Sequence, residues 1–344
     1  MLSIKNELKS TSNRLGWTLA IMVGVMTVVM SLDAFILSFL EYLVNSQIMS
    51  RSAYVAWGAV IDTVCYLSYF LIPTMLFYVM SRKKKTQPIK FQVKFSKYLP
   101  LMILAGLAIT QVAAILNAWF CDLVGYVIPS EDYVQYLTNP EMVALYMTVS
   151  LAPAFAEELL FRGVVYSHLR PYGKTFAILA SAICFSLMHQ NVGQSFYTMV
   201  AGVVMALIYE ATGSIWGSIF LHMFNNLYAV LQTAVMYRYS EGTATVLIYL
   251  SEAVIIFAGV ISTVCLLLVQ KKNAQAQTNQ RMGGVFEINS STTEPASEAL
   301  PASQALKIMS KTPGMITFVA LSLGFTVLAY FGILLINWLG GLPI

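Results

Sequence analysis

Long apolar runs dominate this sequence and determine the environment in which it can fold. Hydrophobic residues make up 58% of the 344 positions and charged residues only 10%, so most of the chain must be surrounded by lipid. A transmembrane helix needs about 20 mostly apolar residues. The sequence therefore predicts an all-α polytopic membrane protein of about nine transmembrane helices in a lipid bilayer. The expected spans are residues 17–44, 53–80, 98–121, 141–166, 174–189, 194–210, 214–236, 245–270 and 313–338.

The positions of the basic residues orient these spans, because cytoplasmic loops carry an excess of Lys and Arg. If the N-terminus is cytoplasmic and the C-terminus lies outside, 18 of the 20 Lys and Arg residues fall in cytoplasmic segments or at the cytoplasmic ends of spans, in residues 5–14, 82–97, 162–174 and 271–311. Arg51 and Arg238 are the two exceptions. We therefore expect a multi-pass protein of the cell membrane in this orientation. The net charge of +4 is too small to indicate a nucleic-acid partner.

The apolar and polar segments also divide the chain into regions. Residues 271–312 are rich in Gln, Ser, Thr, Ala and Glu and lack periodicity, which predicts a disordered cytoplasmic linker. The four cysteines show no Cys-x-x-Cys spacing, so neither a disulfide framework nor a cysteine metal site is indicated. The other expected regions are a cytoplasmic N-terminus (1–16), N-terminal transmembrane helices (17–128), a core carrying the polar residues (140–230), one transmembrane helix (245–270) and a C-terminal transmembrane helix (313–344).

Two carboxylates and a guanidinium stand inside an otherwise apolar span. Ionisable groups at that depth are costly and indicate a functional site. Glu158 and Arg162 are four residues apart, so they face each other on a helix. Glu157 points about 100° away and has no partner within its own helix.

Two of the three histidines also lie within apolar spans. His222 and Asn226 share one helix face because they are four residues apart. The expected turn at Gly173 has Glu157 and His189 16 residues to either side, so an antiparallel hairpin brings them to one depth. For each histidine the alternative is a hydrogen-bonded packing residue. We expect His168 to be a solvated loop residue.

Glu, His, His and Asn in a cavity with little water suit hydrolysis by activated water. Glu157 is the candidate general base and His189 its partner in orienting the water. His222 and Asn226 are candidate donors to an oxyanion. No serine at a nucleophile elbow and no cysteine beside a histidine is found, so activated water is favoured over a covalent route.

No cofactor is predicted, and a zinc site is the alternative. Glu157, His189 and His222 are the residues that could provide three zinc ligands. However, Glu157 cannot act as a base if it is a ligand, and Glu158 is already expected to pair with Arg162. The metal-free mechanism uses each residue once, and we prefer it for that reason.

Three ordered patterns in this chain, Glu-Glu-x-x-x-Arg, Phe-x-x-x-His and His-x-x-x-Asn, resemble those of the CAAX protease and bacteriocin-processing enzyme family, which includes the Ras-converting CAAX endopeptidases. The similarity covers roughly residues 140–230. It implies an intramembrane endopeptidase acting on a peptide or membrane-protein substrate near the cytoplasmic face. It also implies Glu157 as base, His189 as its partner on the water, and His222 with Asn226 as oxyanion donors. Glu158 and Arg162 match the family's supporting pair.

The short Lys-rich loops and compact chain suggest a bacterial member. Two other functions stay open. One is a non-catalytic protein of the same fold, acting as a bacteriocin-immunity factor or as a scaffold for a membrane-protein partner. The other is a proton-coupled transporter, prompted by Asp33, Asp62 and Glu252 in other spans.

Overall fold

A computed structural model describes residues 2–82, 86–93, 96–124, 126, 143, 146–283 and 300–340. This part of the chain is almost entirely helical and contains no strand. Seven of its helices are long and apolar enough to cross a membrane, which confirms the predicted all-α polytopic membrane protein. They are α1 (Leu2–Asn45), α2 (Arg51–Met80), α3 (Leu99–Leu123), α8 (Val192–Thr212), α9 (Ile215–Arg238), α10 (Glu241–Gly283) and α12 (Pro313–Gly340).

The remaining two expected spans are present as helical stretches of a different kind. The first alternates between α- and π-helix and ends in a 3₁₀ turn; the second, α7, has 15 residues. Gly173 joins them with a φ of +145°, a conformation that is strained for any residue with a Cβ atom. The elements are η2 (Tyr146–Leu151), α5 (Ala152–Glu158), η3 (Leu159–Tyr166), α6 (Ser167–Leu169), η4 (Arg170–Tyr172) and α7 (Lys174–Met188).

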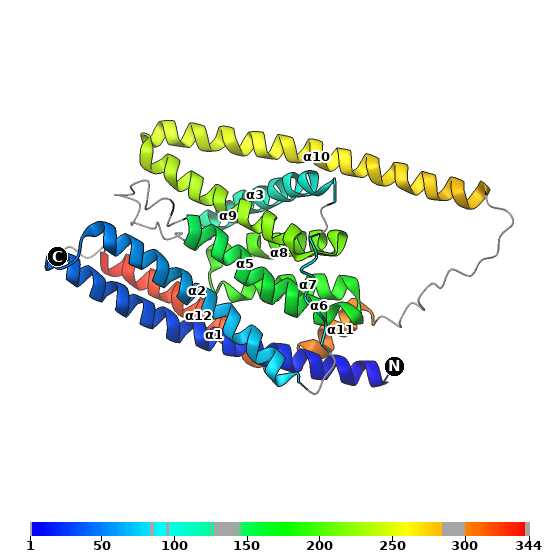
Figure 1. Cartoon of the computed structure of the whole chain (residues 1–344), viewed down its shortest axis with the longest axis horizontal. Coiled ribbons are helices and arrows are strands. Elements are labelled where there is room, and N and C mark those ends of the chain that lie inside the picture. Colours follow the sequence, from blue (N-terminus) through cyan, green and yellow to red (C-terminus); the bar gives the residue numbers. More distant parts are fainter. Residues whose placement is uncertain are drawn as a thin grey trace.

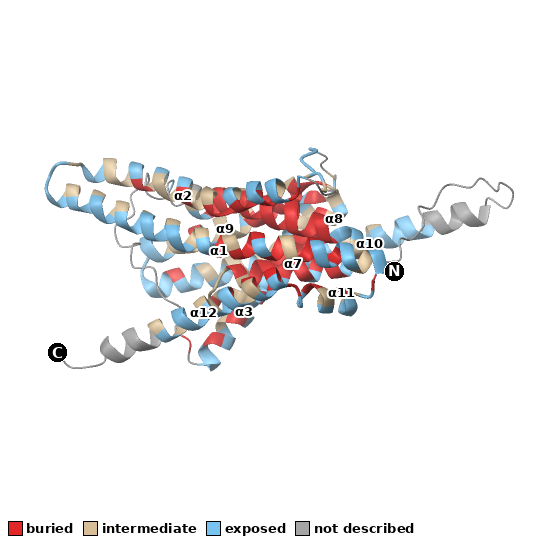
Figure 2. Ribbon diagram, turned by 90° about the horizontal axis from the view of Figure 1, so that it is seen from below, coloured by how far each residue is buried: buried red, intermediate tan, exposed pale blue. Residues whose placement is uncertain are grey.

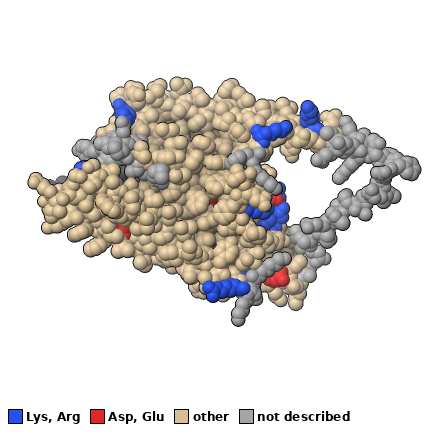
Figure 3. All heavy atoms as spheres, viewed as in Figure 1, with Lys and Arg blue, Asp and Glu red and all other residues tan. Residues whose placement is uncertain are grey.

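The helices form a bundle around the stretch from η2 to α8 (Figure 1). On one side α1 packs against α2 and α12, and on the other α3 packs against α8 and α10. α7 packs against α8. The start of α1 and the end of α12 lie at opposite ends of the bundle (Figure 1). The face seen in Figure 3 is mostly uncharged, as a surface in contact with lipid requires.

Burial differs between the two ends of the bundle (Figure 2). The buried residues of α1 end at Val23, and those of α9 end at His222 except for Val230. We call the end nearer the N-terminus, with η3, α6, α7 and α11, the packed half. The opposite end, with the α1–α2 turn and the last turns of α9, is the cavity half. Large side chains such as Phe35 and Trp57 are exposed in the cavity half.

Residues 86–93, which have no regular secondary structure, pack against the packed half. Its backbone carbonyls accept hydrogen bonds from Ser214 Oγ at 2.6 Å, the Ile215 backbone N–H at 3.0 Å and Trp216 Nε1 at 3.1 Å. Ile89 packs 3.2 Å from where a Cβ atom on Gly163 would stand. The segment thereby fastens the α2–α3 connection to the beginning of α9.

The same segment buries His168, which we expected to be solvated. This expectation is wrong: His168 is 4% exposed. Its Nδ1 donates to the Val164 carbonyl at 2.8 Å, and its Nε2 accepts the Gln87 backbone N–H at 2.9 Å. Its ring also packs against Phe77, with centroids 4.7 Å apart. His168 is therefore a packing residue whose two nitrogens are both satisfied by the backbone.

Parts of the expected disordered linker and of the expected polar N-terminus are helical. α10 continues to Gly283, and α11 covers Ala302–Met309, so the linker prediction is wrong for these stretches. α11 is held because Ala305 and Met309 are buried, and it packs against α1 and α7. The middle of the linker, 284–299, lies outside the described residues. Residues 2–16 form the first turns of α1.

Candidate active site

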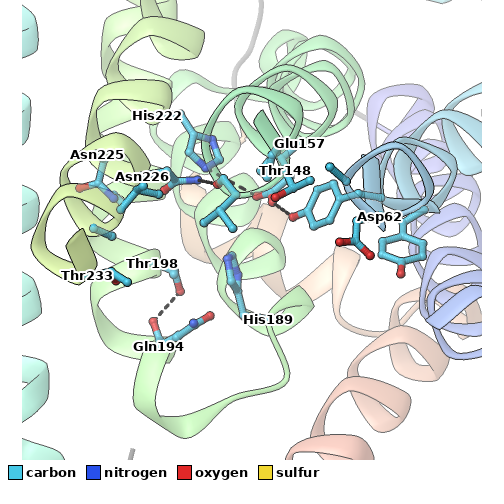
Figure 4. A pocket seen from close by; sticks show the side chains of 18 of the residues that line it. Asp62, Thr148, Glu157, His189, Gln194, Thr198, His222, Asn225, Asn226 and Thr233 are labelled. Carbon is cyan, nitrogen blue, oxygen red and sulfur yellow. Dashed lines mark hydrogen bonds and ion pairs between the residues drawn. The ribbon is translucent and has the colours of Figure 1, made fainter. Parts of the chain in front are cut away.

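A cavity of about 790 Å³ lies between α1, α2, η2, α5, α8 and α9 (Figure 4). All four expected catalytic side chains line it: Glu157, His189, His222 and Asn226. They come from α5, the end of α7 and α9. The structure therefore brings together the residues that the sequence singled out, while their chemical roles stay predictions.

Two turns bring these elements together. At Gly173 the chain reverses, so that α7 packs against η3 and returns His189 to the level of Glu157. Gly213, with a φ of +62°, ends α8 in the left-handed conformation and lets α9 run back beside α5. The depth expected for Glu157 and His189 thus agrees with the cavity that both residues line.

Glu157 is 2% exposed, and its two oxygens have different surroundings. Oε1 accepts a hydrogen bond from the Tyr66 hydroxyl on α2. Oε2 has no hydrogen-bond partner among the described residues and lies 3.9 Å from Nε2 of His222. A buried carboxylate oxygen without a partner is costly, so Oε2 is the atom available to a water or ligand in the cavity.

Glu158 is fully buried and forms hydrogen bonds with both Arg162 and His222. Its Oε1 accepts from Nη1 of Arg162 at 2.8 Å, as the spacing predicted, and from Nδ1 of His222 at 3.0 Å. Arg162 also donates to the Gly202 carbonyl at 3.0 Å and stacks on the Phe185 ring at 4.7 Å. Glu158 therefore positions a catalytic candidate as well as Arg162, a link that the sequence did not suggest.

The hydrogen bonds determine the tautomer of both histidines. The Glu158 carboxylate accepts from Nδ1 of His222, and the Phe185 carbonyl accepts from Nδ1 of His189 at 2.8 Å. In each neutral ring Nε2 is consequently unprotonated. The described residues provide no hydrogen bond to either Nε2. His222 can therefore donate to an oxyanion from Nε2 only after that nitrogen has gained a proton.

Asn226 presents its amide to the cavity from the next turn of α9. Its Nδ2 donates to the Val149 carbonyl in the π-helical η2 at 3.1 Å. An amide nitrogen carries two hydrogens, so one remains available. π-Helical turns are frequent at functional sites, and here η2 holds the Asn226 side chain in place.

The turn after His189 is held by polar side chains from α3 and its following residues. Tyr126 donates to Asn191 Oδ1 at 3.0 Å, and the buried Asn117 donates to the Gly193 carbonyl at 2.6 Å. Asn191 also caps α8 by accepting from the Gly193 N–H at 2.8 Å. The turn is thus anchored to α3. Of the two helices that it joins, α7 has 15 residues and α8 has 21.

Sequence reasoning missed Tyr66. It lies on α2, outside the segment that resembles a known family, and its neighbours Tyr69 and Phe70 pack on it with centroids 5.5 and 5.4 Å away. The available signal was a polar stripe on α2 at Asp62, Tyr66 and Tyr69, spaced for one helix face. That stripe does not distinguish the tyrosine that contacts Glu157 from the others.

Within the described ranges, no group of three or more His, Cys, Asp or Glu side chains is placed to hold a metal ion. Glu157, His189 and His222, the ligands of the zinc alternative, share one cavity but do not form such a group. The need for a metal stays open to experiment.

Comparison with known proteins shows what the core is similar to. Residues 139–228 match the family model described as Type II CAAX prenyl endopeptidase Rce1-like. This part of the chain is similar to the Rce1-like family. The Rce1-like segment contains α5, α7, α8 and the first part of α9, and hence every expected catalytic residue. The family supports a membrane peptidase in general and agrees with the resemblance found in the sequence.

Two bacterial relatives extend the match. UPF0177 protein YvdC of Lactococcus lactis subsp. lactis (strain IL1403) is 25% identical over 165 residues, which are 47% of this chain and 61% of the relative. The putative membrane peptidase YdiL of Bacillus subtilis (strain 168) is 30% identical over 121 residues, 34% of this chain and 49% of the relative. The chain thus covers less than two thirds of each. No solved structure matches.

Proposed function

We propose that this chain is an intramembrane endopeptidase that hydrolyses a peptide bond with water activated by Glu157 and His189. The observation that carries the proposal is the Oε2 atom of Glu157, which is buried, lacks a hydrogen-bond partner among the described residues and adjoins a cavity. A carboxylate in this situation can accept a proton from a water molecule.

The first step is attack on the carbonyl carbon. A water held by Glu157 Oε2 and His189 Nε2 directs its hydrogens to these two acceptors and its oxygen lone pairs to the substrate. Glu157 takes one proton, and the hydroxyl oxygen bonds to the carbonyl carbon. The free N–H of Asn226 then donates to the oxygen that becomes negative.

The second step breaks the carbon–nitrogen bond. His222 Nε2 lies 3.9 Å from Oε2 of Glu157, close enough for the proton to pass between them directly or through a water. A protonated His222 is stabilised by Glu158, which accepts from its Nδ1. The proton goes to the leaving nitrogen, so that one water and one amide give a carboxylic acid and an amine.

The catalytic residues lie nearer one end of the bundle, which we propose is cytoplasmic. His222 follows the start of α9 by seven residues and precedes its end by 16, or roughly 10 and 24 Å along a helix. The start of α9 contacts the Lys-rich 82–97 region through Lys90. We propose that the N-terminus is cytoplasmic and the C-terminus outside.

Replacing Glu157 by Gln tests the function. We expect Glu157→Gln to remain folded in detergent and to lose cleavage by about 10²- to 10⁴-fold, the contribution of a general base. To find substrates, the membrane peptides of cells that express the parent chain are compared with those of cells that express Glu157→Gln. Cells that express Glu252→Gln, a change on α10, are the control. A parental rate in Glu157→Gln contradicts the base assignment, and unchanged peptides favour a scaffold or immunity protein.

Cysteine labelling tests the orientation. A cysteine at Gln277 should react with a membrane-impermeant reagent only from the cytoplasmic side, and one at Thr243 only from outside. The reverse pattern inverts the orientation without affecting the proposed chemistry.

A further inference from the structure

The cavity extends beyond the catalytic residues into the cavity half. There it is lined by Asp33 on α1 and Asp62 on α2, both inside otherwise apolar spans. Asp62 lines the same cavity as Tyr66, the tyrosine that contacts Glu157. Asp62 precedes Tyr66 by four residues, so the two are about 6 Å apart along the helix axis. The acidic pair and the catalytic carboxylate therefore border one continuous space.

No ion pair joins either aspartate to a cationic side chain among the described residues. Their carboxyl groups lie close enough to interact electrostatically. Within the described part of the chain, Oδ1 of Asp33 is buried without a hydrogen-bond partner. Arg51, also on the cavity wall, stacks on the Tyr54 ring at 4.9 Å.

A second feature of the same cavity indicates that it accepts a ligand. Glu157 is 2% exposed, yet its Oε2 borders the cavity without a hydrogen-bond partner in the described residues. A packed structural core does not leave such groups around a space of about 790 Å³. The carboxyl groups of Asp33, Asp62 and Glu157 therefore give this space acceptors for a polar, positively charged group.

We propose that Asp33 and Asp62 form a subsite for a cationic group of the peptide substrate, such as a lysine, an arginine or a free α-amino group. This inference rests on the proposed peptidase function. Both aspartates line the same cavity as Glu157, so a peptide held at Glu157 can place a cationic group beside them. A bound cation would offset the charge of the two neighbouring carboxylates.

The experiment uses the full chain in detergent and apolar fluorogenic decapeptides. In each peptide one lysine is placed at a different position, and a matched peptide carries norleucine there. We expect lysine at one position of the series to raise kcat/KM about tenfold or more over norleucine. Asp62→Asn should remove this preference, whereas Glu252→Gln should keep it. Equal cleavage of both peptides by the parent, or a preference that survives Asp62→Asn, overturns the subsite.

A binding measurement separates failure of the subsite from failure of the function. The lysine peptide should raise the Tm of Glu157→Gln more than the norleucine peptide, and adding Asp62→Asn should abolish the difference. If the parent cleaves no peptide but this difference is seen, the subsite stands and the peptidase function fails. If neither cleavage nor lysine-dependent stabilisation is seen, the subsite is overturned too, and proton transfer by the pair becomes the explanation to test.

Discussion

The packed half and the cavity half use the same residue types in opposite ways. In the packed half His168 has both ring nitrogens bonded to the backbone. In the cavity His189 and His222 each have Nδ1 bonded, while Nε2 receives no hydrogen bond from the described residues. Burial alone therefore does not identify a functional histidine; the nitrogen left without a partner does.

The two adjacent glutamates differ in their surroundings. Glu158 is bonded through Oε1 to Arg162 and His222 and does not line the cavity. Glu157 is bonded through Oε1 to Tyr66 and lines the cavity. In both, Oε2 has no hydrogen-bond partner among the described residues, so the cavity beside Glu157 is what makes its free oxygen available. Neighbouring positions on one helix thus carry a structural carboxylate, Glu158, and a carboxylate available for chemistry, Glu157. Mutations can test this difference in role.

The largest stability effect is expected from Glu158→Ala. The change leaves the fully buried Arg162 guanidinium without its carboxylate, and breaking a buried ion pair in this way costs about 3–5 kcal/mol. Unfolding in detergent should show this loss, while Glu157→Ala, which strands no cation, should show much less. Replacing both partners by apolar residues in Glu158→Leu/Arg162→Met should recover most of the stability. Equal stability of Glu158→Ala and the parent contradicts the pairing.

The histidines should separate stability from activity. His168→Ala leaves the Gln87 backbone N–H without its acceptor, so it should cost about 1–3 kcal/mol and leave the rate per folded molecule unchanged. His222→Ala should do the reverse and lower peptide cleavage by about a hundredfold or more. Thermal unfolding and cleavage of one verified peptide measure both. Loss of rate in His168→Ala at full folding would show that the packed half also takes part in the reaction.

The sequence predicted the bundle and the convergence of the site better than the roles within it. Apolar length and the i,i+4 spacings depend on local geometry, so the spans and the Glu158–Arg162 pair could be read directly. His168 could not, because its burial depends on residues 86–93, far away in the chain. The contact of Tyr66 with Glu157 and the hydrogen bond between Glu158 and His222 depend on which helices pack together. The sequence alone does not give this packing.

A smaller effect on rate should follow from Tyr66→Phe. The Tyr66 hydroxyl donates to Oε1 of Glu157 and so orients Oε2 toward His222. Hydrogen bonds to charged groups contribute about 1.5–3 kcal/mol. We expect kcat to fall about tenfold or more with little change in KM, since the ring still fills its place. Tyr69→Phe is the matched control, because no hydrogen bond joins its hydroxyl to Glu157. A larger loss in Tyr69→Phe would contradict the positioning role.

We expect the smallest effect from metal chelation. This experiment tests whether Glu157 Oε2 and the Nε2 atoms of His189 and His222 bind a metal ion or a water molecule. Histidines that bind zinc usually donate their other nitrogen to a carboxylate or carbonyl, as His222 and His189 do here, so these hydrogen bonds suit either case. The distinction rests on Glu157: Oε1 accepts from Tyr66, and Oε2 cannot be both a zinc ligand and the base. We therefore expect 1,10-phenanthroline and EDTA to leave peptide cleavage unchanged. Stoichiometric zinc in the purified active protein, with activity lost on chelation and restored by zinc alone, would assign Oε2 to the metal and require another base.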